Sequence, residues 1–169
     1  MRSRLGLPEP EIAGPGEESV WAYPRPPELA PDKRHVEVRF GGEIIASSTR
    51  TVRHLETASP PTFYIPPEDV SGEFLEPADG SSFCEWKGRA VYLDVVAGKR
   101  RARQAAWSYP RAASPYQSLS GWLAFYPGRV DECFVNRELV RAQPGPFYGG
   151  WITDEIRGPV KGPPGTEWW

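Results

Sequence analysis

Sulfur is scarce in this sequence. Its 169 residues include two cysteines, Cys84 and Cys133, and a single methionine. Two cysteines cannot build the multi-bridge framework of a small secreted domain, and they are too few for a zinc site made of cysteines. We therefore expect reduced thiols, with a Cys84–Cys133 disulfide as the less favoured alternative, and we expect no metal and no cofactor.

Long apolar runs are absent as well. No segment approaches the roughly 20 residues that a membrane-spanning helix needs, and the opening residues lack the apolar centre of a secretory signal. These absences lead us to expect a cytoplasmic protein with no membrane association. The net charge of −2 also provides no overall attraction to nucleic acid.

One short stretch is strongly basic although the whole chain has a small negative net charge. The stretch GKRRARQ, residues 98–104, holds four basic residues and no acidic one. Nucleic-acid binders usually carry a wider basic stripe with exposed aromatic residues. We interpret the stretch as a charged hairpin tip in water, and nucleic acid is not an expected partner.

Proline, glycine and aromatic residues are abundant instead. The chain has 20 prolines, 17 glycines and seven each of Trp, Tyr and Phe, a mixture typical of short strands and tight turns. We predict a mainly β fold: a compact antiparallel domain over residues 36–142 with one or two short helices. A proline-rich arm over residues 1–35 and an aromatic extension over residues 143–169 would flank it.

Alternating residues and turn signals place individual elements. Residues 36–46 predict a hairpin, because Gly41 and Gly42 suit a two-residue turn. Residues 51–57 and 61–66 each predict a short strand, and residues 89–107 predict a second hairpin with its tip near Gly98. Apolar residues at helical spacing predict a short helix over residues 116–126.

The aromatic residues between positions 104 and 130 raise the main functional question. A small β domain can use Trp and Tyr as core, but both need a polar partner when buried, and Leu or Val would fill a core more simply. Aromatic walls with a few convergent polar groups are instead typical of a small-molecule pocket. The proposed walls are Trp86, Trp107, Tyr109, Trp122 and Tyr126, and the proposed orienting groups are Arg53, Glu56, Tyr64 and Lys87.

Two other classes of function remain open. An enzyme could use His54 and Glu56, which share one face of a strand, for acid–base chemistry, or use Cys84 beside Lys87 as a nucleophile. A solvated ion pair and an inert packed thiol are the simpler interpretations of these residues. An interaction module could instead form a homodimer through the extension, whose tryptophans would form a contact surface.

Several ordered stretches resemble a known family. VRFGGEIIASSTRTVRHLET, TFYIPPEDV, FLEPADGSSFCEWKGRAVYLDV, AAWSYP and GWLAFYPGRVD together are similar to domain of unknown function family 427, which is also labelled nucleotidyltransferase-like. The resemblance implies a mostly bacterial family and a tent-like β fold of the kind that carries small-ligand pockets. The family's usual Cys-Pro-Tyr-Lys-Gly is replaced here by Cys84-Glu85-Trp86-Lys87-Gly88.

The nucleotidyltransferase label finds little support in the residues. Such enzymes commonly use a glycine-rich phosphate loop and closely placed carboxylates that hold Mg²⁺. Here Gly41-Gly42 falls at a hairpin tip, and the adjacent Glu68 and Asp69 would face opposite sides of a strand. We therefore favour binding of a small polar or charged molecule, and an enzyme acting at the same pocket remains the alternative.

Overall fold

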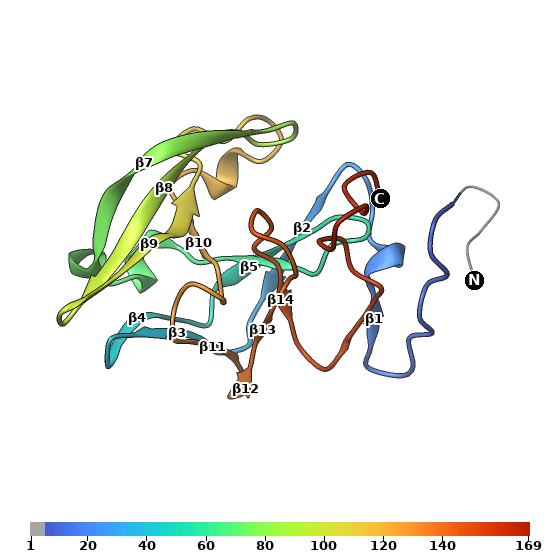
Figure 1. Ribbon diagram of the computed structural model, residues 1–169, viewed down its shortest axis with the longest axis horizontal. Coiled ribbons are helices and arrows are strands. Elements are labelled where there is room, and N and C mark those ends of the chain that lie inside the picture. The colour runs from blue at the N-terminus through green and yellow to red at the C-terminus, as the bar shows by residue number, and fades with distance from the viewer. Residues whose placement is uncertain (1–5) are drawn as a thin grey trace.

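The computed structural model describes residues 6–169 and shows a mainly β protein (Figure 1). Its strands form two four-stranded sheets, one three-stranded sheet and two short strand pairs within the described range. The mainly β, largely antiparallel fold predicted from the sequence is confirmed. Residues 1–5 of the expected N-terminal arm lie outside the described residues.

The first four-stranded sheet has the order β10-β9-β8-β7. The predicted hairpin at Gly98 is confirmed, because β8 and β9 pair antiparallel from Ala97 and Arg100 outward. Strands β7 and β8 form the outer hairpin of the same sheet. The strands are β7 (Leu75–Cys84), β8 (Gly88–Ala97), β9 (Arg100–Ser108) and β10 (Leu123–Phe125).

The second four-stranded sheet has the order β12-β11-β3-β4. The predicted hairpin at Gly41-Gly42 is confirmed, and both glycines have positive φ values, +61° and +81°. Gly41 also meets the first sheet, because a Cβ atom there would lie 2.7 Å from the carbonyl oxygen of Ala97. The strands are β3 (Val36–Phe40), β4 (Glu43–Ser48), β11 (Glu132–Val135) and β12 (Glu138–Leu139).

The three-stranded sheet has the order β2-β5-β6, with β2 at Glu28–Asp32, β5 at Thr51–Leu55 and β6 at Thr62–Tyr64. Strand β2 falls within the expected N-terminal arm, and its edge position accommodates Pro31, which has no N–H to donate. Reciprocal backbone hydrogen bonds of 2.8 and 2.9 Å join Ile65 to Leu123. They place the end of β6 beside β10 of the first sheet.

The helix predicted over residues 116–126 is wrong. The segment contains one 3₁₀ turn, η4 (Gln117–Leu119), and then enters strand β10. Gly121 adopts φ +79°, which interrupts any continuous helix. The helical spacing arose because residues of a turn and of a fully buried strand both contribute to the core.

The main core lies between the two four-stranded sheets and reaches the C-terminal segment. Trp151 is fully buried in it, stacks on Phe63 with ring centres 4.9 Å apart, and donates from Nε1 to the carbonyl of Phe125 at 2.9 Å. Trp151 begins β14 (Trp151–Ile152), which pairs with β13 (Arg141–Ala142). The expected extension therefore contributes directly to the packed interior.

The two ends of the described chain lie together at one side of the molecule (Figure 1). There β1 (Glu18–Ser19) pairs in parallel with β15 (Ile156–Arg157). Three further 3₁₀ turns complete the elements: η1 (Val20–Ala22), η2 (Pro67–Asp69) and η3 (Gly72–Phe74). Within residues 6–169, no helix has the length and apolar character needed to cross a membrane.

Candidate functional site

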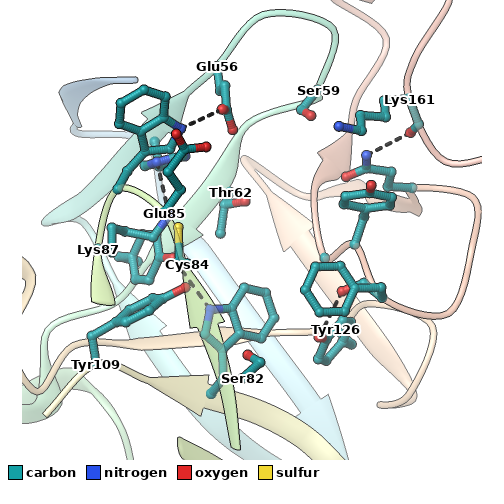
Figure 2. Close-up of a pocket in the computed structure, with 18 of the residues that line it drawn as sticks. Glu56, Ser59, Thr62, Ser82, Cys84, Glu85, Lys87, Tyr109, Tyr126 and Lys161 are labelled. Atoms are coloured by element: carbon teal, nitrogen blue, oxygen red, sulfur yellow. Dashed lines mark hydrogen bonds between the residues drawn. The ribbon is translucent and has the colours of Figure 1, made fainter. Parts of the chain in front are cut away.

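A cavity of about 380 Å³ opens between the three-stranded sheet, the β7–β9 face of the first sheet and the C-terminal segment (Figure 2). Its size is within the range of small-molecule sites. Aromatic rings, hydroxyl groups and charged groups all face it. The lining residues are Arg25, His54, Glu56, Ser59, Pro60, Thr62, Tyr64, Ser82, Phe83, Cys84, Glu85, Trp86, Lys87, Tyr92, Trp107, Tyr109, Tyr126, Gln143, Phe147, Tyr148, Gly149 and Lys161.

Most of the residues proposed from the sequence meet at this cavity. The structure brings together residues from strands β5, β6, β7 and β9, from the turn between β7 and β8, and from the loop after β10. The lining members of the proposed set are Glu56, Tyr64, Trp86, Lys87, Trp107, Tyr109 and Tyr126. The other two, Arg53 and Trp122, do not line it.

Arg53 points to a different environment. Its guanidinium lies 2.9 Å from a carboxylate oxygen of Glu18 and 3.3 Å from one of Asp32. Neighbouring strand residues face opposite sides, so His54 faces the cavity while Arg53 faces the terminal segments. Trp122 is half-buried and packs against the aromatic cluster from outside the cavity.

The buried polar centre of the cavity is the contact between Lys87 and His54. Lys87 Nζ lies 3.0 Å from His54 Nε2, and the two residues are only 5% and 6% exposed. A lysine ammonium has only donors, so Nε2 accepts and the imidazole proton resides on Nδ1. Burial, together with the positive charge of Lys87, lowers the pKa of His54 to about 3. The imidazole is therefore neutral near pH 7.

The phenols around Lys87 are also neutral. Burial raises the pKa of Tyr64 and of Tyr109 above the usual value for tyrosine. Trp107 donates from Nε1 to the Tyr64 hydroxyl at 3.4 Å, and Lys87 Nζ lies 5.3 Å from the centre of the Tyr109 ring. Lys87, Cys84 and Tyr109 lie together on one side of the cavity in Figure 2.

Glu56 and Trp86 form a second polar contact near the opening. Trp86 donates from Nε1 to Glu56 Oε1 at 2.9 Å, and Arg25 Nε lies 3.9 Å from the same oxygen. This pairing occupies the carboxylate that sequence reasoning had assigned to a free orienting role. No hydrogen bond joins Glu56 to His54 among the described residues, so these two side chains do not form an acid–base pair in this arrangement.

The C-terminal segment closes the opposite wall. The rings of Trp107 and Tyr126 lie 4.6 Å apart, and Tyr126 donates its hydroxyl hydrogen to the carbonyl of Phe147 at 2.9 Å. Gly149 packs so closely that a Cβ atom there would lie 2.2 Å from Cη2 of Trp107. Only glycine at this position allows the backbone to lie against the indole ring.

Lys161 and Gln143 belong to this wall and were missed by sequence reasoning. The Gln143 side chain accepts from the Gly150 backbone at 3.0 Å and donates to the Lys161 carbonyl at 2.7 Å, which fixes two parts of the segment together. Lys161 Nζ lies 5.4 Å from the centre of the Tyr148 ring, and burial lowers its pKa. In the sequence, the Gly149-Gly150 pair was a signal that the backbone packs closely here, but the sequence did not indicate which residues the pair would contact.

The two cysteines have different surroundings. Both are free thiols; Cys84 is half-buried at the cavity, whereas Cys133 is buried in the core, where burial raises its pKa. Across residues 6–169, no group of three or more His, Cys, Asp or Glu side chains is arranged to hold a metal ion. Cys84 is the thiol that a molecule in the cavity could reach.

The basic residues of the β8–β9 hairpin are partly neutralised. Arg100 pairs with Asp131 at 2.7 Å, and Arg101 pairs with both Glu76 and Asp94. These contacts hold two of the four basic side chains of residues 98–104 against carboxylates on the protein surface.

Comparison with known families identifies one match. The model of the family described as Domain of unknown function (DUF427) matches residues 28–136. That range contains the three sheets except β12, and it ends before the C-terminal wall of the cavity. No curated protein matches the chain significantly.

Proposed function

The chain belongs to the family described as Domain of unknown function (DUF427), and because that description names no activity, we propose a function from the cavity: binding of a small polar or charged molecule. The observation that supports this proposal is a cavity of about 380 Å³ that combines aromatic walls with convergent polar groups. Small-molecule sites have this composition, with a few polar groups setting orientation. The aromatic residues therefore serve both as core and as wall.

The burial of aromatic residues in the C-terminal extension supports a pocket more than it supports a dimer surface. Trp151 is fully buried within its own chain, and Phe147 and Tyr148 line the cavity. Trp168 is the tryptophan of the extension that remains largely exposed, at 56%. Trp151 and the cavity-lining rings of Phe147 and Tyr148 are thus used within one chain, whereas Trp168 and part of the Phe147 ring, which is 57% exposed, remain at the surface.

The enzyme alternative has weaker support than binding. Glu56 is occupied by Trp86 and Arg25, and His54 accepts from Lys87. A base must be within hydrogen-bond reach of the proton that it removes, and no hydrogen bond joins Glu56 to His54 within residues 6–169. Binding needs only the shape and polarity already present.

A variant that fills the cavity tests the proposal. Thr62 lies on β6 and faces the middle of the cavity (Figure 2), so Thr62→Phe should occupy it without removing a core side chain. The matched control is Thr49→Phe, at an exposed position outside the cavity.

The measurement is a thermal-shift screen with small anions, cations, zwitterions and neutral polar compounds. A compound at 100 times its dissociation constant should add about 2.7 kcal/mol to the stability of the native state. We expect a shift in the wild type and in Thr49→Phe that is lost in folded Thr62→Phe. Equal shifts in all three proteins, or no shift with any compound, would contradict binding at this cavity.

A further inference from the structure

Lys87 is a buried cation without a buried anion. It is 5% exposed, and its one polar side-chain contact in the described part of the chain is His54 Nε2. The ion pairs of residues 6–169 do not include Lys87. Buried charges in proteins are normally paired, because removing an ion from water is costly. The neutral imidazole supplies an acceptor but no negative charge.

The groups near Lys87 suit an anionic oxygen. Tyr64 and Tyr109 remain neutral because burial raises the pKa of each phenol, so both can act as hydrogen-bond donors. Burial and the charge of Lys87 keep His54 neutral as well. An anion placed at Lys87 would therefore meet one full positive charge and neutral donors, in surroundings of low dielectric constant where charge-assisted hydrogen bonds are strong.

The charge balance favours a single negative charge. The charged side chains that line the cavity are Arg25, Lys87 and Lys161 against Glu56 and Glu85, so the lining carries a formal charge of +1, which one negative charge on a ligand balances. Lys161 lies on the other side of the cavity from Lys87 in Figure 2. One ammonium therefore acts on one end of a ligand, which matches a carboxylate better than a doubly charged phosphate.

The remaining walls favour a flat apolar body. The Trp107 and Tyr126 rings meet at 4.6 Å with an interplanar angle of 50° and line the cavity beside Tyr109. Phe83 and Phe147 line the same cavity and are 78% and 57% exposed, which places apolar rings toward solvent. Aromatic rings pack on one another in tilted or offset arrangements and gain stability beyond the area that they bury.

From these features we infer that the cavity takes a small aromatic carboxylate, with the carboxylate at Lys87 and the ring against Trp107 and Tyr126. The inference rests on the proposed binding function and adds the chemical class of the ligand. It also assigns Lys87 a role that its packing alone does not require, since an apolar side chain would fill the same buried position without a desolvation cost.

Three probes of similar shape test the charge preference on the unmodified chain. Sodium benzoate, benzamide and benzylamine each present a phenyl ring, with a negative, neutral and positive group respectively. We expect calorimetric or NMR titration to show binding of benzoate, binding of benzamide at least about tenfold weaker, and the weakest binding for benzylamine. A tenfold difference corresponds to about 1.4 kcal/mol.

Two lysine variants test the position of the anion. Lys87→Met should weaken benzoate binding by about tenfold or more, while the melting temperature stays equal to or rises above that of the wild type, because a buried unpaired charge has been removed. Lys99→Met is the matched control, at an exposed position outside the cavity, and it should change benzoate affinity by less than about threefold. A purely structural Lys87 would instead give a lower melting temperature and unchanged affinity.

The outcomes separate this inference from the proposed function. Preferred binding of benzamide or benzylamine would leave the pocket function intact and overturn the anionic class. Undiminished benzoate binding by folded Lys87→Met would overturn the role of Lys87. No binding by any of the three probes would overturn the aromatic carboxylate, and a hit with a different class in the wider screen would still support the pocket.

Discussion

Lys87 Nζ lies 3.0 Å from His54 Nε2, and both side chains are buried. The contact joins the turn between β7 and β8 to strand β5, across 33 positions of sequence. It places a positive charge and a neutral imidazole at the wall of the same cavity. Protonation of the imidazole would put two positive charges in contact, so this pair makes the protein sensitive to acid.

We expect the folded protein to lose stability as pH falls below the ordinary pKa of histidine. The ordinary pKa of histidine is 6.5, whereas the pKa of His54 in the folded protein is about 3, so between these values the unfolded chain binds a proton that the native state does not. The free energy of unfolding should then fall with pH, by at most about 1.4 kcal/mol per pH unit from this group. Urea unfolding of the wild type and His54→Gln at several pH values measures it.

The glutamine variant serves as the control because its side-chain oxygen can still accept from Lys87 but does not titrate. Its stability should depend less steeply on pH across this window. An NMR titration that showed the His54 ring protonating near pH 6.5 would contradict the prediction.

Gly149→Ala should destabilise the protein by about 1–3 kcal/mol, because the added methyl group overlaps the buried Trp107 ring. The same methyl group would lie 3.3 Å from Cδ1 of Tyr126, so the cavity should change shape as well. Gly72→Ala is the matched control, since nothing lies within 4 Å of a Cβ atom at that position, and it should change stability by less than about 0.5 kcal/mol. Equal effects of the two substitutions in urea unfolding would argue against close packing at Gly149.

Trp151→Ala should cost about 3–5 kcal/mol, because it removes a fully buried ring, its stack on Phe63 and its hydrogen bond to the Phe125 carbonyl. Trp168→Ala removes the same kind of side chain at a position that is 56% exposed, so a loss of less than about 1 kcal/mol is expected. Chemical unfolding of both variants compares them. A small effect at Trp151 would mean that the C-terminal segment is not part of the core.

Asp32→Asn should destabilise the protein by about 1–3 kcal/mol at neutral pH, since the buried carboxylate contacts Arg34 at 2.7 Å and Arg53 at 3.3 Å. Solvent weakens this ion pair, because the Arg34 side chain is 30% exposed. Burial alone would raise the pKa of Asp32, but hydrogen bonds from Arg34 lower it below 3.8. The carboxylate therefore stabilises the fold above that pH, and the contribution is lost as pH falls through the lowered pKa.

The difference between wild type and Asp32→Asn should accordingly shrink in acid, as measured by unfolding at pH values above and below about 4. Asp154→Asn is the control, because this aspartate pairs with Arg141 while its side chain is 81% exposed. It should change stability by less than about 0.5 kcal/mol at either pH.

Local patterns in the sequence were sufficient to predict the hairpins. The alternation around Val36 and Val38 and the positive φ of Gly41 are determined by neighbouring residues, and so is the turn at Gly98. The helix over residues 116–126 was wrong because spacing alone does not distinguish a buried strand after a turn from one helical face. Only the pairing of Leu123 with Ser108 resolves that ambiguity.

The aromatic and polar character of the candidate site could be predicted from the sequence, but only part of its membership could. Trp86, Trp107 and Tyr126 could be proposed because aromatic residues dominate their segments, and the β7–β8 turn brings Lys87 beside them. The sequence could not show that His54 lines the cavity and Arg53 does not, because the sheet face that meets the cavity depends on partners far along the chain. Lys161 lies 107 residues from His54 in sequence, and no local signal connects the two.

The C-terminal wall also has a consequence for biosynthesis. The contact of Gly149 with Trp107 and the stacking of Trp151 on Phe63 both need residues that are translated after all four strands of the first sheet. A nascent chain that ends before these residues can pair β8 with β9, but it lacks one side of the cavity. A ligand would therefore recognise only a chain that already includes these residues, and its binding would act on a later stage of folding than the first hairpins.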